Sequence, residues 1–378
     1  MAEIILRDKR MISEKWYELY QYINDHIDDL PCESEITEKF NERLMFISRQ
    51  FSQPGPSAYK QRDWLEHEAF TQVLGRVLQQ VKLTKLQFYF LFDTLMAAEL
   101  SQTAMVVTNT HESLLSPQEL KCCSGRVHEQ LGDHMTGRQM FEEAIAIDPA
   151  NPTLYQYLGF NYLYSGEAEM ATECFLESIE VAPEFIAGYQ NLAGLAYQES
   201  DFEKALKYAE LVFERDTSLP STYITAISSC LALGLNGQAD KWVALAFDHN
   251  VAAIELVRLA GITAHQNGRL EEALEALDHY LSVKENNFDA FYIRARVKAE
   301  LDLYESLETD IKQLLVFEPH DEWCLEQLFL CYFQREQWLD AQQIMLELKK
   351  LSPQYQIIHK EKFNTINKRT SLNVVEIS

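Results

Sequence analysis

The chain has 378 residues, of which 47% are hydrophobic and 24% are charged, a composition typical of a folded protein rather than a disordered one. Its formal charge is -25, from 58 acidic and 33 basic residues. A field of this sign repels phosphate backbones, so it disfavours nucleic acids and anionic membranes as partners and favours basic segments.

Targeting and compartment can also be judged from composition. No stretch approaches the about 18 apolar residues that a membrane-spanning helix needs. Residues 1–10 carry charges around a short apolar run, so they lack the apolar core of a signal peptide. The seven cysteines form no CxxC pair, as expected of reduced thiols. We therefore expect a cytoplasmic protein.

The first 57 residues are expected to form an N-terminal helical pair, with helices over 12–30 and 34–51. This pair is also a candidate surface for a homo-dimer. The sequence Gln-Pro-Gly-Pro-Ser at 53–57 concentrates helix-breaking residues and predicts a domain boundary.

A second helical region is expected over 58–117, with helices at about 59–81 and 84–102. The latter is apolar on most of its circumference, so it must be buried; its large apolar residues are Phe88, Tyr89, Phe90, Phe92 and Leu95. Residues 84–117 fit either a degenerate repeat of the array described next or an amino-terminal cap or dimerisation module.

Self-similarity dominates the rest of the chain. Prolines at 149 and 183 are 34 residues apart, as are those at 319 and 353, and 183 and 319 are separated by four such periods. In the same frame, one column of mostly small residues reads Gly137, Ala171, Ala205, Ala239, Ala273, Leu307 and Ala341. A second reads Gly125, Gly159, Ala193, Ile227, Gly261, Ala295 and Phe329. Small side chains at fixed positions predict closely packed helix pairs.

These columns resemble the tetratricopeptide repeat family, in which each 34-residue unit is a helix-turn-helix. The unit 152–185 carries the family pattern at Tyr155, Leu158, Gly159, Tyr162, Ala171, Phe175 and Pro183. The resemblance implies an all-α, right-handed superhelix, or α-solenoid, of about seven tandem units over 118–355. The units are 118–151, 152–185, 186–219, 220–253, 254–287, 288–321 and 322–355.

Turns and the end of the array follow from residue types. Turns between the helices of a unit are expected at Ser165-Gly166, 199–201, Asn236-Gly237 and Asn267-Gly268, whose residues accept left-handed backbone or cap helices.

Residues 356–378 are expected to form a cap helix and tail. Within it, apolar Ile357, Ile358, Phe363 and Ile366 lie opposite Lys360, Lys362, Lys368 and Arg369. A basic partner-binding tail is the alternative.

Catalysis is not expected. His128 and His134 are six residues apart and fall on different helix faces, and no carboxylate or second pair completes a metal site. The chain has no G-x-S-x-G, no phosphate-binding glycine loop and no H-E-x-x-H. We expect no cofactor, no metal and no enzymatic activity.

The resemblance implies a concave groove lined by the second, fifth, ninth and twelfth positions of the first helices. The candidate partner-binding residues are Gln156, Phe160, Leu163, Tyr164, Gln190, Tyr197, Ile224 and Leu231. This aromatic and aliphatic lining suits a peptide, with amides available to its backbone. The alternative for each residue is packing against the next unit.

Repeat proteins that hold the acidic tails of heat-shock chaperones use Lys and Asn at the fifth and ninth positions. Here the fifth positions are Cys122, Gln156, Gln190, Ile224, Arg258, Tyr292 and Glu326. The ninth positions are Arg126, Phe160, Gly194, Ser228, Ile262, Arg296 and Leu330. No unit supplies that set, so the chain does not resemble this class of co-chaperone.

Three functions remain open. The first is a non-catalytic adaptor or scaffold that binds an apolar or basic peptide in the groove. The second is a secretion-type chaperone of the bacterial repeat class, although such proteins usually have about three repeats. The third is a structural subunit that contacts partners through its convex face or N-terminal helices.

Overall fold

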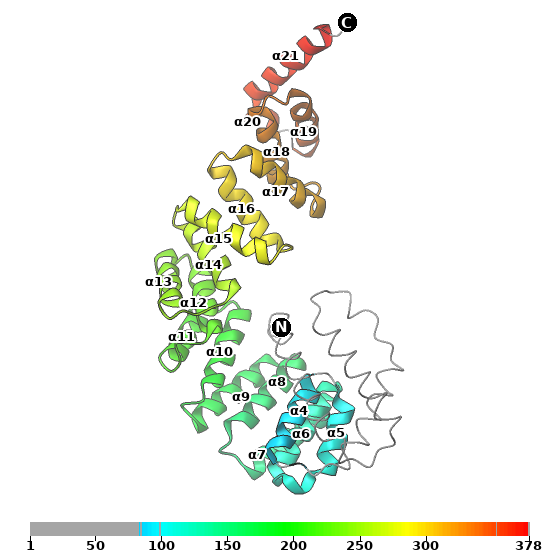
Figure 1. Cartoon of the computed structure of the whole chain (residues 1–378), viewed down its shortest axis with the longest axis vertical. Coiled ribbons are helices and arrows are strands. Elements are labelled where there is room, and N and C mark those ends of the chain that lie inside the picture. The colour runs from blue at the N-terminus through cyan, green and yellow to red at the C-terminus, as the bar shows by residue number, and fades with distance from the viewer. Residues whose placement is uncertain (1–82, 84, 98–99, 353, 377–378) are drawn as a thin grey trace, which may run out of the picture. The chain divides into compact units, whose positions relative to one another are not determined.

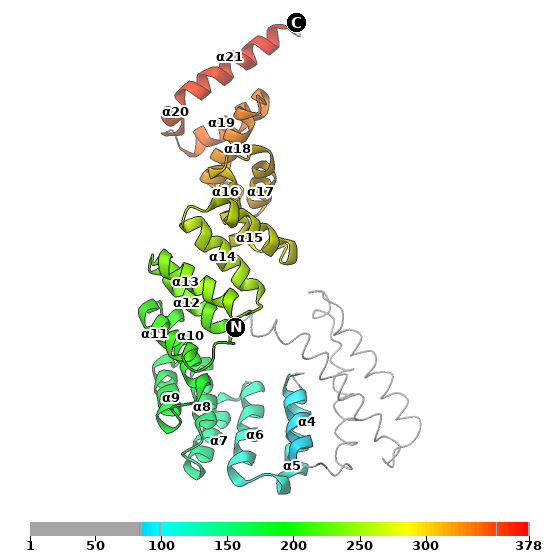
Figure 2. The same ribbon diagram turned by 60° about the vertical axis from the view of Figure 1, so that its left-hand side comes forward.

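The computed structural model describes residues 83, 85–97, 100–352 and 354–376, and every regular element in these ranges is a helix (Figures 1 and 2). The helices expected over 12–30, 34–51 and 59–81, the breaker cluster at 53–57 and the N-terminal dimer surface lie outside the described residues. No described helix combines the length and apolar character that crossing a bilayer requires. The chain divides between Gly188 and Tyr189 into two compact units.

In the first unit each α-helix packs against the next α-helix along the chain. The helices are α4 (Lys85–Ala97), α5 (Ser101–Thr110), the short η3 (Glu112–Leu114), α6 (Pro117–Gln130), α7 (His134–Ile147), α8 (Pro152–Tyr164) and α9 (Ala168–Val181). The dividing point falls inside α10 (Ile186–Gln198).

The second unit continues the same succession. Its helices are α11 (Phe202–Phe213), α12 (Pro220–Ala232), α13 (Asn236–Asp248), α14 (Ile254–Gln266), α15 (Leu270–Val283), α16 (Phe288–Glu300), α17 (Tyr304–Phe317), α18 (Glu322–Gln334), α19 (Trp338–Leu351), α20 (Gln354–Ile358) and α21 (Lys360–Glu376). From α11 to α19 each helix contacts its successor. The all-α repeat architecture expected from the sequence is confirmed.

The single helix expected over 84–102 is wrong, because two helices occupy this segment. The amide of Leu100 donates to the carbonyl of Leu95 at 2.9 Å, and α5 starts at the next residue. α4 then packs against α5 and contacts α6, so Phe88, Phe92 and Leu95 are fully buried without a longer helix. The α4–α5 pair precedes α6–α7 by one period, as the ion pair between Lys85 and Glu119, 34 residues apart, illustrates.

The periodic prolines follow the ends of second helices. Asp148, Ala182, Glu318 and Ser352 are the C-cap residues of α7, α9, α17 and α19. Proline is favoured directly after such a cap because it cannot continue a helix. The expected 34-residue spacing of helix ends is therefore confirmed.

From α6–α7 to α18–α19, each turn inside a helix pair contains one residue with left-handed backbone, again spaced by 34. These residues are Gly132, Gly166, Ser200, Gly234, Gly268, Asp302 and Glu336, with φ between 56° and 81°. The turn expected at Asn236-Gly237 is wrong: Asn236 begins α13, and Gly234 makes the turn. The repeat frame determines this position, so even Asp302 and Glu336 adopt a conformation that side chains disfavour.

The columns of small residues lie where helices approach closely. A Cβ atom on Gly159 would lie 2.5 Å from the ring of Phe175, and one on Gly125 would lie 2.6 Å from Phe141. In both pairs the partner follows by 16 residues, from the first helix to the second helix of the same pair. At the equivalent position of α18 the small residue is replaced by Phe329, and the residue 16 positions later, in α19, is the flexible Met345 of the same core cluster. The expected close helix packing is confirmed.

The C-terminal segment forms two helices rather than one over 356–369. Phe363 and Ile366 of α21 are buried in the core cluster that includes α19, as expected of a cap. Ile357 and Ile358 of α20 are exposed instead, because the helix ends there and α21 restarts at Lys360. Between them, the buried His359 lies 2.6 Å from a carboxylate oxygen of Glu326.

Candidate partner-binding site

The predicted groove residues of the first unit all lie on α8. Gln156, Phe160 and Leu163 are half-buried. The ring of Phe160 packs edge-on against Phe175 of α9, with centroids 5.6 Å apart, so this residue also serves the core. Tyr164 is 54% exposed and lies over the ring of His134. Tyr164 is therefore the aromatic residue of this set that is most available to a partner.

The predicted residues of the second unit lie on α10 and α12. Gln190 donates from Nε2 to Ser221 Oγ at 3.0 Å, so its amide is already used. Ile224 and Leu231 pack against the core cluster of α12 and α13. Tyr197 is 39% exposed and contacts Phe202 through its ring edge. As on α8, the tyrosine is the most accessible member.

Arg126, which holds a ninth position, does not present a free cation. Its guanidinium lies 4.8 Å from the ring centroid of Phe92 and 5.2 Å from that of Tyr157. It also forms an ion pair of 2.8 Å with Asp93 of α4. The ring contacts and the ion pair tie α4, α6 and α8 together, so this position has a structural role.

A cleft of about 580 Å³ opens along α16; we call it the α16 cleft. Its lining comprises one residue of α14, four residues of α16 and the two cap residues of the α17–α18 connection. These are Arg258 of α14, Phe288, Asp289, Tyr292 and Ile293 of α16, and the caps Glu318 and Asp321. Arg258 and Tyr292 hold fifth positions, and Asp289 holds a second position, in the register of the predicted groove. The cleft thus uses the predicted face of the first helices, in later repeats than the residues singled out from the sequence.

Aromatic rings form a continuous row beside the cleft. Phe317, which is 69% exposed, meets Phe288 with centroids 5.9 Å apart, and Phe288 stacks on Tyr292 at 6.3 Å. Tyr292 then contacts Trp323 of α18 at 5.0 Å. Rings in such a row supply large contact area with few rotatable bonds, which suits an extended ligand.

Negative charge dominates the cleft. Arg258, the cation in its lining, forms an ion pair with Glu255 one turn earlier. Asp321 caps α18 by accepting from the amide of Cys324 at 2.7 Å. Within the part of the chain that the structure describes, the exposed carboxylates of Asp289 and Glu318 form no ion pair or hydrogen bond. Two carboxylates at the cleft are therefore left to solvent or to a ligand.

Tyr292 is a neutral phenol at physiological pH. Burial raises its pKa above the ordinary value, and the carboxylate of Asp321 raises it further, against the opposing effect of Arg296. Its ring face is consequently an uncharged surface beside the carboxylates, which is suited to a cation.

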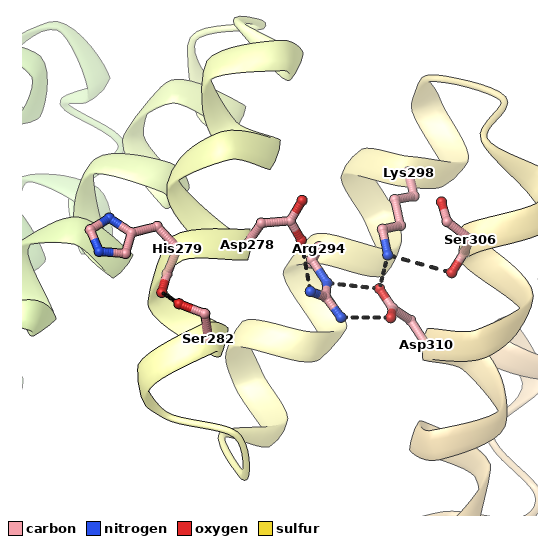
Figure 3. Close-up of polar contacts among 7 residues, drawn as sticks. All are labelled: Asp278, His279, Ser282, Arg294, Lys298, Ser306 and Asp310. Carbon is pink, nitrogen blue, oxygen red and sulfur yellow. Dashed lines mark hydrogen bonds and ion pairs between the residues drawn. The ribbon is translucent and has the colours of Figure 1, made fainter.

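The opposite side of α16 is fixed by a buried ion cluster, shown in Figure 3. Arg294 makes two contacts of 2.7 and 2.9 Å with Asp310 of α17 and one of 2.7 Å with Asp278 of α15. Lys298 Nζ lies 2.8 Å from the same Asp310 carboxylate. The Asp310 side chain is 2% exposed, so one buried anion holds two cations of the helix that forms the cleft wall.

The described cysteines are free thiols, five of them buried and Cys122 half-buried. Burial raises the pKa of Cys122 to about 11 and that of Cys123 to about 12, so both stay protonated near neutral pH and are poor nucleophiles. In the described ranges no three His, Cys, Asp or Glu side chains are grouped so that they could hold a metal ion.

Sequence comparisons are sparse. No protein-family profile matches this chain. It is similar to the Sol locus transcriptional repressor of Clostridium acetobutylicum, with 24% identity over 91 residues, or 24% of this chain. The matched stretch spans only 29% of the length of that relative. Nothing about partners or activity passes to this chain from so partial a match.

Solved structures with similar folds are repeat proteins. YrrB, described as a tetratricopeptide repeat protein with an unusual peptide-binding site, is 18% identical, with 50% of this chain and 99% of that chain covered and a TM-score of 0.45. A repeat protein of Cytophaga hutchinsonii is 14% identical, with 64% of this chain and 99% of that chain covered and a TM-score of 0.49. A tetratricopeptide repeat protein from Parabacteroides merdae is 14% identical, with 66% of this chain and 98% of that chain covered and a TM-score of 0.47.

The deciding observation lies in the chain itself. Helix pairs recur every 34 residues, with a small residue of the first helix against the second helix, and in α8–α9 the family residues Gly159 and Phe175 form this contact. The described helices form an array of 34-residue helix pairs with the fold of tetratricopeptide repeats.

Some features of this repeat array were not predicted from the sequence. The candidates predicted from the sequence lie in the middle repeats and do not include Phe288, Asp289 and Ile293, although Tyr292 holds a fifth position in the same register. Glu318 and Asp321 lie in the connection between repeats, outside the groove offsets of the family. The Arg294–Asp310 pair has the same 16-residue offset as Gly159 and Phe175, and this offset is the signal that would have found it.

Proposed function

We propose that this chain is a non-catalytic scaffold that holds a protein or peptide partner on the first-helix face of its repeats. The observation that supports this most is the α16 cleft, where groove-register residues, an aromatic row ending at the exposed Phe317, and carboxylates without a partner among the described residues coincide. Within the second unit the exposed Tyr197 adds an earlier first helix to this set, and in the first unit the exposed Tyr164 occupies a similar place at the end of α8. The remaining predicted groove residues, Gln156, Phe160, Leu163, Gln190, Ile224 and Leu231, would contribute where they are not already used in packing.

We also propose that the repeat units begin at residues 118, 152, 186, 220, 254, 288 and 322. The α4–α5 pair, one period earlier, would be a degenerate eighth unit, and α21 would cap the array. The position of α4–α5 beside α6 supports this assignment over a separate dimerisation module.

The scaffold proposal predicts that Tyr164→Ser and Tyr197→Ser each reduce partner capture by about fivefold or more, since an anchoring aromatic residue contributes about 1 kcal/mol or more to binding. Capture would be measured by affinity pull-down with quantitative mass spectrometry. The matched control is Phe247→Ser, because Phe247 is 62% exposed on the second helix α13. Thermal melts of all variants should match the wild type.

A second candidate is a structural subunit that binds through its second helices. It is favoured by the exposed apolar residues of those helices, which include Met135, Phe247, Val316, Leu339 and Leu346. Loss of the partner in Phe247→Ser, with retention in both tyrosine variants, would replace the scaffold proposal with this one.

A further inference from the structure

We infer that the α16 cleft binds an arginine side chain of a partner peptide, flanked by an apolar residue. This inference rests on the proposed scaffold function and names the chemistry of the ligand. It is carried by the coincidence, in one cleft, of an aromatic wall, carboxylates that have no basic partner among the described residues, and the exposed ring of Phe317 against Phe288 of the wall.

The charges define the ligand as a cation. Asp289, Glu318 and Asp321 all line the cleft, whereas its single guanidinium, Arg258, is paired with Glu255. Arg296 also acts on Tyr292 electrostatically, but three carboxylates outnumber it. Two other carboxylates at helix contacts of the second unit have basic partners, Asp240 with Arg269 and Asp310 with Arg294. A positively charged group from a partner would supply the partner that this cleft lacks.

The rings favour arginine over lysine. A planar guanidinium stacks on an aromatic face and can still offer hydrogen bonds in its plane to a carboxylate on each side. Tyr292 supplies a neutral ring face, stacked on Phe288, with Asp289 next to Phe288 and Asp321 in the next connection. An ammonium group is a compact, strongly hydrated charge that gains less from this arrangement.

The exposed ring of Phe317 defines what stands beside the arginine. It contacts Phe288 and is 69% exposed, so an aliphatic or aromatic residue adjacent to the arginine would cover it. A cleft of about 580 Å³ is of the size that takes side chains of a bound segment. A peptide with arginine followed by phenylalanine therefore satisfies both the charge and the apolar surface.

The test uses the full chain and a synthetic peptide with the sequence Gly-Ser-Gly-Leu-Arg-Phe-Gly-Ser-Gly, blocked at both ends, titrated by calorimetry. A second peptide carries citrulline, the neutral isostere, in place of arginine, and a third carries lysine. We expect binding of the arginine peptide to be about tenfold tighter than that of the citrulline peptide, and tighter than that of the lysine peptide. Raising the salt concentration should weaken it.

The test variant is the double substitution Asp289→Asn with Glu318→Gln. It should weaken binding of the arginine peptide by about fivefold and leave binding of the citrulline peptide unchanged. The control, Glu305→Gln, removes an exposed carboxylate from the first turn of α17, outside the cleft lining, and should change neither. Since neither mutated cleft carboxylate has a partner in the described ranges, the variants should melt like the wild type.

Equal binding of the arginine and citrulline peptides, no detectable binding, or an unaffected double variant would overturn the inference. Self-association of the chain that the double variant abolishes would make a second copy the occupant, and would overturn it as well. These outcomes are separable from failure of the scaffold proposal. Capture of the partner through Tyr164 and Tyr197 can persist while the arginine peptide fails to bind.

Discussion

Replacing Asp310 with alanine is expected to lower the free energy of unfolding by about 3–5 kcal/mol, which is the cost of removing one partner from a buried ion cluster. Asp310 is the buried anion between Arg294 and Lys298, and both cations are themselves largely shielded from water. Without it, Arg294 keeps Asp278 as its carboxylate partner, and Lys298 keeps a 3.4 Å contact with the carbonyl of Ser306 (Figure 3).

Urea unfolding monitored by circular dichroism measures this effect. The matched control is Asp278→Ala, which removes the other carboxylate on Arg294; this carboxylate is 52% exposed, so we expect a loss of about 1 kcal/mol or less. The loss of unfolding free energy for Asp310→Asn should lie between those of the two alanine variants, since the amide oxygen still accepts a hydrogen bond. Equal losses for Asp310→Ala and Asp278→Ala would show that the cluster does not hold α16 in place.

The second large effect concerns the contact between small and large residues in α8–α9. Gly159→Ala is expected to destabilise the protein by about 1–3 kcal/mol, the usual cost of overpacking a close-packed core. The added methyl group would lie 2.5 Å from the ring of Phe175, and both residues are buried, so the ring or the helix must shift.

The chain also supplies the compensating change. In the helix pair α16–α17 the positions equivalent to Gly159 and Phe175 are Ala295 and Ile311, and both are fully buried. The double variant Gly159→Ala with Phe175→Ile copies this pair into α8–α9. It should recover a large part of the loss, and the coupling energy from the double-mutant cycle should exceed about 0.5 kcal/mol. Additive losses would mean that the two side chains do not oppose each other.

The fold was predictable because its determinants repeat. The prolines after Asp148 and Ala182 and the column from Gly137 to Ala341 fixed the period, and each lies where the period requires. The turns were less predictable, because the repeat frame imposes left-handed backbone even on Asp302 and Glu336, which residue type does not suggest. For the same reason the turn predicted from the dipeptide Asn236-Gly237 was wrong, since the turn is made by Gly234.

The candidate site was less predictable than the fold. The family register identifies a face, and Tyr292 was on it, but exposure depends on what each ring packs against. Phe160 turns to Phe175, whereas Tyr164 stays exposed. The cleft further depends on the connection that brings Glu318 and Asp321 beside α16, and no groove offset describes that connection.

The central claim is that fold and site both derive from a 34-residue unit, and the most direct test is deletion of one unit. Removing residues 220–253, which contain α12 and α13, joins two equivalent points of the register. We predict that this variant keeps a cooperative thermal transition and a helical signal per residue close to that of the wild type. Removing residues 220–236, half a unit, should abolish the transition because first helices would then meet the wrong faces. Loss of cooperative folding in both variants, or its survival in both, would contradict the account.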